Sequence, residues 1–255
     1  MASNLVECTD RDGIAILTLA HGKASAMDLE LCGAVEDALR EAEQSSAKAI
    51  VLTGRGGIFS AGVDLFRVVE GSAADVERFL TAMRDLFIRV FTFPKPAVAA
   101  VNGHAIAGGC VLACACDYRL MASGPGTIGI PELKVGVPFP AIALEVVRAV
   151  VSPPFLQDLV YTGRVCAPEE ARRVGLIDDV VSSERLVERA CEVAAEFAAH
   201  PAASFAIAKQ MLRQPAMDRV TAAASSTDRR VFELWSAPAT RAAIREYMDR
   251  TFAKR

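Results

Sequence analysis

The stretch at 102–117, NGHAIAGGCVLACACD, contains a glycine-rich turn of a kind that could stabilise negative charge. An apolar run at 96–101 predicts a buried strand before the turn, and the small apolar residues after Gly108 and Gly109 could open a helix. The first N–H groups of a helix have no partner within it, and the helix dipole adds positive potential at that end. The stretch therefore suits an anion or a developing oxyanion, although a glycine pair before a helix is more often a packing device.

A second glycine-containing turn, IFSAGVDL at 58–65, also lies between an expected strand and an expected helical turn. Two strand-to-helix turns that each offer a backbone N–H could converge on one oxygen atom. That is the minimum geometry of an oxyanion hole, in which fixed donors stabilise charge as it develops. The second turn is weak evidence alone, and the pair is a stronger indication of such a site.

The composition limits which partners and sites we expect. The chain has 255 residues, of which 52% are hydrophobic, and a net charge of -3, so nothing indicates nucleic acid or an anionic membrane as a partner. Seven scattered cysteines are typical of a reducing, cytoplasmic compartment, and three histidines without ligand spacing argue against a metal site. The N-terminus lacks the apolar segment of a secretory signal, and we interpret 96–116 as a buried strand and helix rather than a membrane span.

The order of the expected elements predicts an α/β fold with a largely parallel sheet. A hairpin is expected at 5–19, a helix capped by Asp28 as far as residue 44, and a strand at 48–53, which together suggest a crossover connection. We expect 54–62 to be loop. A helix at 74–91 and a strand at 118–122 flank the glycine-rich stretch on its two sides.

The second half of the chain is expected to be mainly helical. Two helices are expected at 141–161, separated at 152–154 with Ser152 as a cap, and a short helix from Pro168 to Gly175 should precede a strand at 176–181. Helices with breaks near three prolines should follow from residue 183, at Pro201, Pro215 and Pro238. We predict a core at 1–200 and a C-terminal helical region at 201–255 that serves docking or oligomerisation.

Four blocks occur in one order that resembles a known family. They are FSAGVDL, KPAVAAVNGHAIAGGCVLACACDYRLMA, IGIPELKVG and TGRVCAPEEARRVGLIDDVV. The chain is similar to the crotonase superfamily, which contains enoyl-CoA hydratases and isomerases. The resemblance covers nearly the whole chain and implies a crotonase-like spiral of ββα units with a C-terminal helical region. It also implies an assembly of trimers or dimers of trimers.

The resemblance also implies roles for individual residues. The oxyanion donors would be the N–H groups of Val63 and Gly108, and Glu132 matches the family's carboxylate. Glu132 has few charged neighbours in sequence, so burial would raise its pKa toward the range of a general base, whereas a solvated loop glutamate beside Lys134 is the alternative. The CoA thioester, which brings coenzyme A as part of the substrate and needs no further cofactor, would contact Lys23, Ala24, Ser25, Ala26, Ala61, Gly62, Asp64, Leu65, Gly109 and Val111.

Val111 departs from the hydratase pattern. Hydratases carry a second glutamate at this position, three residues after the oxyanion glycine, and two carboxylates together hold and orient one water. One carboxylate suffices to move a proton between C2 and C4 of an enoyl thioester. The segment 136–144, GVPFPAIAL, also lacks the glycine-rich run common in hydratases. We therefore expect isomerisation of 3-enoyl-CoA to 2-enoyl-CoA; the alternatives are a hydratase of reduced efficiency and a non-catalytic acyl-CoA-binding protein.

Other polar residues near these motifs are expected to be structural. Asp64 should cap the following helix and Asp117 should satisfy backbone donors. His104 reads as a hydrogen-bonded core residue, and the cysteines of the central stretch read as packing: Cys110, Cys114 and Cys116. In the tail, Lys209, Phe252 and Lys254 could contact the CoA phosphates or adenine, although solvated lysines are the simpler reading.

Overall fold

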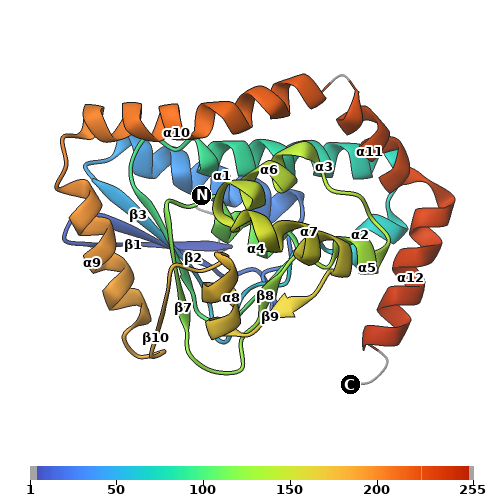
Figure 1. Cartoon of the computed structure of the whole chain (residues 1–255), viewed down its shortest axis with the longest axis horizontal. Helices are drawn as coiled ribbons and strands as arrows, with labels where there is room; N and C mark the ends of the chain where they lie inside the picture. Colours follow the sequence, from blue (N-terminus) through green and yellow to red (C-terminus); the bar gives the residue numbers. More distant parts are fainter. Residues whose placement is uncertain (1–4, 225, 253–255) are drawn as a thin grey trace.

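The structure, a computed structural model, describes residues 5–224 and 226–252, and in this part of the chain the strands form two sheets (Figure 1). The main sheet has the order β1 (Val6–Arg11), β2 (Ile14–Leu19), β3 (Ala49–Gly54), β5 (Ala97–Val101), β7 (Tyr118–Ala122) and β10 (Asp179–Val181). The smaller sheet has the order β4 (Ile58–Ser60), β6 (His104–Ile106), β8 (Ile128–Gly129) and β9 (Val165–Cys166).

Helices join and cover these strands. Within the described residues they are α1 (Leu29–Gln44), α2 (Leu65–Glu70), α3 (Ala73–Phe91), α4 (Gly108–Cys114), α5 (Glu132–Val135), α6 (Ala141–Val150), α7 (Pro153–Thr162), α8 (Pro168–Val174), α9 (Leu186–Ala198), α10 (Ala202–Ala223), α11 (Thr227–Ser236) and α12 (Pro238–Phe252).

The main sheet confirms the predicted hairpin and crossover. β1 and β2 are antiparallel, and the neighbouring pairs from β2 to β10 are parallel. Asp28 caps α1 as expected, because its side chain accepts the N–H of Leu31 at 2.8 Å. The parallel connection from β2 to β3 runs through α1, as the succession of strand, helix and strand predicted.

Both faces of the main sheet are covered, which explains its unbroken apolar strands. Alternate residues such as Val51 and Val98 contact α9 on one face. Their neighbours Ile50 and Leu52 belong to the large core cluster with α1, α3 and α4 on the other face. β5 is buried along its whole length, as parallel strands between two helical layers usually are.

The smaller sheet corrects the sequence prediction at 54–62, which we expected to be loop. Residues 58–60 form β4, which pairs with β6, and β6 pairs in turn with β8. Strands of two or three residues are too short for an alternating pattern to show in the sequence. This sheet matters because the two glycine turns start where β4 and β6 end.

Three further local predictions need correction, the first only in part. Ser152 takes the N-cap position of α7 as predicted, but its side chain makes no capping hydrogen bond, and α7 begins at Pro153, whose fixed φ suits a first helical position. The strand expected at 176–181 is shorter, since β10 begins at Asp179. Pro215 does not break the tail but lies inside α10.

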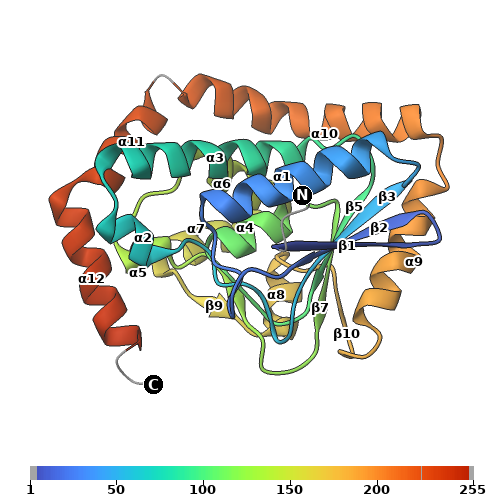
Figure 2. The same ribbon diagram turned by 180° about the vertical axis from the view of Figure 1, so that it is seen from behind.

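The C-terminal helices fold back on the rest of the same chain. Figures 1 and 2 show α10 along one side of the molecule, with α9 and α12 at opposite ends. α12 contacts α2 and α5, and Arg245 donates to the carbonyl oxygen of Val69 at 3.2 Å. The boundary drawn at residue 200 falls between α9 and α10, while the role of the tail in oligomerisation stays a prediction. The described helices include none that is both long and apolar enough to cross a membrane.

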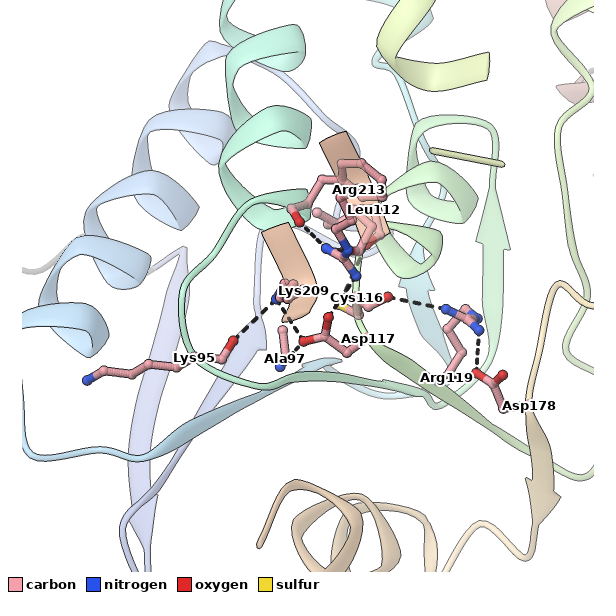
Figure 3. Close-up of polar contacts among 11 residues, drawn as sticks. Lys95, Ala97, Leu112, Cys116, Asp117, Arg119, Asp178, Lys209 and Arg213 are labelled. Atoms are coloured by element: carbon pink, nitrogen blue, oxygen red, sulfur yellow. Dashed lines mark hydrogen bonds and ion pairs between the residues drawn. The ribbon is translucent and has the colours of Figure 1, made fainter. Parts of the chain in front are cut away.

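A buried ionic cluster fixes α10 to the core (Figure 3). Asp117 accepts hydrogen bonds from Lys209 Nζ at 2.7 Å, from Arg213 Nη2 at 2.8 Å and from the Ala97 N–H at 2.8 Å. Arg213 also donates to the Ala115 carbonyl at 3.0 Å, just after α4 ends. Asp117 thus satisfies a backbone donor, as expected, and in addition pairs with two cations of the tail.

Lys209 therefore has a different role from the one predicted. Its side chain is only 6% exposed, so it is neither solvated nor placed to contact a CoA phosphate. Burial lowers its pKa to about 8, and Asp117 opposes that shift. The side chain of Phe252 and the whole of Lys254 lie outside the described residues.

Candidate active site

The two glycine turns lie against each other. A Cβ built on Gly62 would come within 2.4 Å of the Ile106 carbonyl oxygen and 3.1 Å of the Gly108 nitrogen. Gly62 also has φ +80°, a conformation that side chains rarely adopt. A glycine is therefore required at this point, and the contact places Val63 and Gly108 side by side on the wall of one cavity.

The N–H groups of Val63 and Gly108 have no acceptor among the described residues, although the neighbouring N–H groups do. Asp64 donates to the Met27 carbonyl at 2.9 Å, and Ala107 donates to the Gly129 carbonyl at 2.8 Å. An oxyanion hole requires two unpaired N–H groups on the wall of a cavity, held in place by the backbone around them. Val63 and Gly108 provide such N–H groups, and the hydrogen bonds of Asp64 and Ala107 hold the backbone beside them. The arrangement fits the sequence prediction for both residues.

Ala107 holds the second turn in a strained conformation. Its φ of +50° and ψ of -121° are unusual for any residue with a Cβ, and it immediately precedes Gly108. Such conformations cost on the order of 1–3 kcal/mol and often occur at functional sites.

Ala107→Gly should relieve this strain. We expect the free energy of unfolding in urea to rise by about 1 kcal/mol, because the relief exceeds the extra chain entropy that glycine brings to the unfolded state. Ala105→Gly is the matched control and should destabilise, since Ala105 lies in β6 and does not have a positive φ. A loss of stability in Ala107→Gly would show that the turn is not strained.

The predicted CoA loop is tied to the first turn. The Ser60 hydroxyl donates to the Ser25 carbonyl at 2.7 Å, and the Ala61 N–H donates to the Ala24 carbonyl at 2.9 Å. Of the predicted substrate-binding residues, six line the cavity: Ala24, Ala26, Ala61, Asp64, Leu65 and Val111. The other four, Lys23, Ser25, Gly62 and Gly109, do not.

Glu132 is the first residue of α5 and lines the same cavity. It is 7% exposed, and its Oε2 has no hydrogen-bond partner among the described residues. Burial raises the pKa of this carboxyl group to about 8. The alternative of a solvated loop glutamate beside Lys134 is therefore wrong.

The cavity has a volume of about 670 Å³ and mainly apolar walls. Asp64 is committed to structure, since its Oδ1 accepts the Arg67 N–H at 3.2 Å and caps α2 as predicted. His104 is hydrogen-bonded to Thr127 at 3.0 Å, also as expected, although it lines the cavity. The cysteines of the central stretch are fully buried packing residues, as expected: Cys110, Cys114 and Cys116.

Four residues of the cavity wall come from distant helices and were not predicted from the sequence. Met83 and Phe87 belong to α3, Trp235 to α11 and Tyr247 to α12. The sequence predicted the helix that carries the first two but could not show that they face a cavity. Trp235 and Tyr247 lie in the C-terminal helices, which the sequence analysis interpreted only as a docking element. The same chain therefore supplies the two glycine turns and the helices that complete the cavity wall.

The sequence model of the family described as enoyl-CoA hydratase/isomerase matches residues 9–253. The chain belongs to this family. Curated relatives include a protein of Thermus thermophilus named putative enoyl-CoA hydratase, which is 39% identical over 189 residues, 73% of each chain. Mitochondrial enoyl-CoA delta isomerase 1 of Mus musculus is 30% identical over 219 residues, 85% of this chain and 76% of the relative.

A solved structure of this enoyl-CoA hydratase/isomerase family has the same fold. The human mitochondrial delta3-delta2-enoyl-CoA isomerase superimposes with a TM-score of 0.94 at 25% identity and covers 98% of this chain and 99% of its own. The predicted crotonase-like α/β fold with a C-terminal helical region is thereby confirmed. Family membership makes the chain an acyl-CoA enzyme of the hydratase or isomerase type.

Proposed function

We propose that the chain isomerises 3-enoyl-CoA to 2-enoyl-CoA with Glu132 as the proton shuttle. The observation that carries the proposal is that Glu132 and Val111 line the same cavity. Glu132 is a buried carboxylate, and Val111, 1% exposed, lines the cavity at the position of the second hydratase glutamate. The other carboxylate among the described lining residues, Asp64, is occupied as a helix cap.

The proposed reaction begins at the thioester carbonyl, whose oxygen is held by the N–H groups of Val63 and Gly108. The Glu132 carboxylate removes a proton from C2, and the electron pair of the C–H bond moves into a dienolate whose charge rests on the carbonyl oxygen. The two N–H donors stabilise that charge. Glu132 then returns the proton to C4, which leaves the double bond between C2 and C3, so no water or further group enters the reaction.

Hydration of 2-enoyl-CoA is the second candidate, because the relative with 39% identity is named a putative hydratase. Water addition needs a bound water with hydrogen-bond partners, and Val111 offers none. We therefore propose at most a reduced hydratase activity. A non-catalytic acyl-CoA-binding protein would need Glu132 to stay protonated with substrate bound.

The test is a survey of 2-enoyl and 3-enoyl thioesters of several chain lengths, read by absorbance and mass. Isomerisation should convert a 3-enoyl-CoA to a conjugated thioester without a change in mass. Water addition to crotonyl-CoA at ordinary enzyme rates would favour the hydratase. Tight acyl-CoA binding with no change in any thioester would select the non-catalytic protein.

The pH profile should report Glu132. Because the base must be ionised and burial raises the pKa of Glu132 to about 8, we expect kcat/KM to rise with pH. The rise should be about tenfold per pH unit below the pKa and should level off near pH 8 to 9. A rate that is already constant between pH 5 and pH 7 would contradict an essential carboxylate with a raised pKa.

Further properties of the chain are proposed by family likeness. We propose that it forms a homotrimer or a dimer of trimers in the cytoplasm and uses no cofactor beyond the CoA of its substrate. The residues proposed to face the CoA thioester are the cavity-lining members of the two loops, Ala24, Ala26, Ala61, Asp64 and Leu65. We propose neither a nucleic acid nor a membrane as a partner.

A further inference from the structure

The cavity has an exposed end and a buried end. At the exposed end, Phe66 is 57% and Val165 is 43% exposed, and Lys134 also faces solvent. At the buried end no lining residue is more than 3% exposed, and all are apolar except for one indole N–H: Met83, Phe87, Val111, Val137, Ala143 and Trp235.

This difference fixes the direction of a bound acyl-CoA. The nucleotide of CoA is charged and has to remain in water, so it belongs at the exposed end. Gly108 lies next to Phe87, since a Cβ built on Gly108 would be 3.6 Å from the Phe87 ring. The buried end of the cavity therefore begins beside the N–H group of Gly108, the proposed oxyanion donor. With the thioester carbonyl at Gly108, only the acyl chain can enter the buried end.

Trp235 lines the cavity in an orientation that a hydrogen bond holds. Its Nε1 donates to the Pro138 carbonyl at 2.9 Å, and the residue is 2% exposed. Asp228, seven residues earlier on the same face of α11, accepts the Ala141 N–H at 2.8 Å. Two bonds thus fasten α11 to Pro138, which lies between α5 and α6, and to Ala141, the first residue of α6, so the indole is held more firmly than a free side chain.

We propose that the Trp235 indole is the end wall of the acyl pocket and sets the longest straight acyl chain that the site buries in full. The inference rests on the proposed binding of an acyl-CoA thioester but not on the reaction. Each methylene that enters the apolar end should raise the affinity about fourfold. This gain ends when the chain reaches the indole.

The test is calorimetric binding of saturated acyl-CoA thioesters, lengthened two carbons at a time, to the full chain. Saturated thioesters cannot be isomerised, so binding is measured separately from catalysis. For the wild type we expect the dissociation constant to fall roughly 15-fold per step and then to stop falling at one chain length. In Trp235→Ala that limiting length should move at least two carbons higher, and in Ala143→Leu it should move lower.

Phe232→Ala is the matched control. Phe232 is an aromatic residue of the same helix that packs against the core without lining the cavity, so its removal should leave the limiting length unchanged. If Trp235→Ala does not fold, Trp235→Leu replaces it with the same expectation. If a folded Trp235 variant has the same limiting chain length as the wild type, Trp235 is not the end wall of the acyl pocket. If the limiting length shifts in the variant but the wild-type chain has no isomerase activity, only the proposed reaction is wrong.

Discussion

Glu132→Gln should lower kcat for isomerisation by about 10²- to 10⁴-fold, the usual contribution of a positioned general base. Glutamine has nearly the same shape but cannot accept the C2 proton, so the dissociation constant for a saturated acyl-CoA should stay within about twofold. The measurement is turnover of a 3-enoyl-CoA followed by the absorbance of the conjugated thioester.

A second buried glutamate provides the control. Glu145 is also 7% exposed, but it pairs with Arg219 at 2.7 Å and does not line the cavity. Glu145→Gln should therefore weaken an ion pair and leave kcat unchanged. Full turnover in Glu132→Gln would remove Glu132 from the role of base, and an equal loss of kcat in both variants would point to general damage.

The same substitution has a stability readout with a defined sign. The pKa of Glu132 is raised in the folded state from 4.5 to about 8, so the folded chain binds more protons than the unfolded chain between these values. Its contribution to stability is therefore lost as the pH rises through this window. Glu132→Gln does not ionise, so it should be more stable than the wild type above pH 8, with the difference shrinking toward pH 5.

Asp117→Ala should lower the free energy of unfolding by about 3–5 kcal/mol. The substitution removes the carboxylate that pairs with Lys209 and Arg213, whose side chains are 6% and 13% exposed, and leaves both buried cations without an opposite charge. It also leaves the Ala97 N–H unpaired within β5. Urea unfolding of the full chain measures the loss.

An exposed ion pair of the same chemistry is the control for Asp117. Asp85 pairs with Arg84 at 2.8 Å but is 58% exposed, so Asp85→Ala should change the stability by about 0–1 kcal/mol. If Asp117→Ala cost no more than this control, the buried cluster would not hold the tail. Combining Asp117→Leu with Lys209→Met should restore part of the loss, because one unpaired cation is then removed.

The sequence predicted several of the long elements well because their burial leaves a periodic pattern. α1 showed an apolar face and the Asp28 cap, α3 showed mixed polar and apolar residues, and β3 and β5 showed apolar runs typical of strands covered on both sides. β4 and β8 could not be predicted, since strands of three and two residues contain too few repeats of an alternating pattern to stand out.

The candidate site divides in the same way. The turns at Val63 and Gly108 could be predicted from the sequence, because glycine is needed where the two backbone turns pack against each other. The burial of Glu132 depends on contacts that α5 makes with α7 and α12, so the local sequence alone favoured a solvated residue and the family resemblance was needed to favour a catalytic one. Lys209 was misjudged for a similar reason, as its partner Asp117 precedes it by 92 residues.

The cluster around Asp117 also constrains the order in which the chain can mature during synthesis. Asp117 ends the segment that carries Gly108, but its two cations are not made until almost a hundred residues later. Domains generally fold as units while the N-terminal part emerges first. Until Lys209 and Arg213 arrive, the Asp117 carboxylate has to remain hydrated, and the Ala115 carbonyl just after α4 lacks the hydrogen bond from Arg213. The last fifth of the chain thus determines when the first four fifths become a finished enzyme.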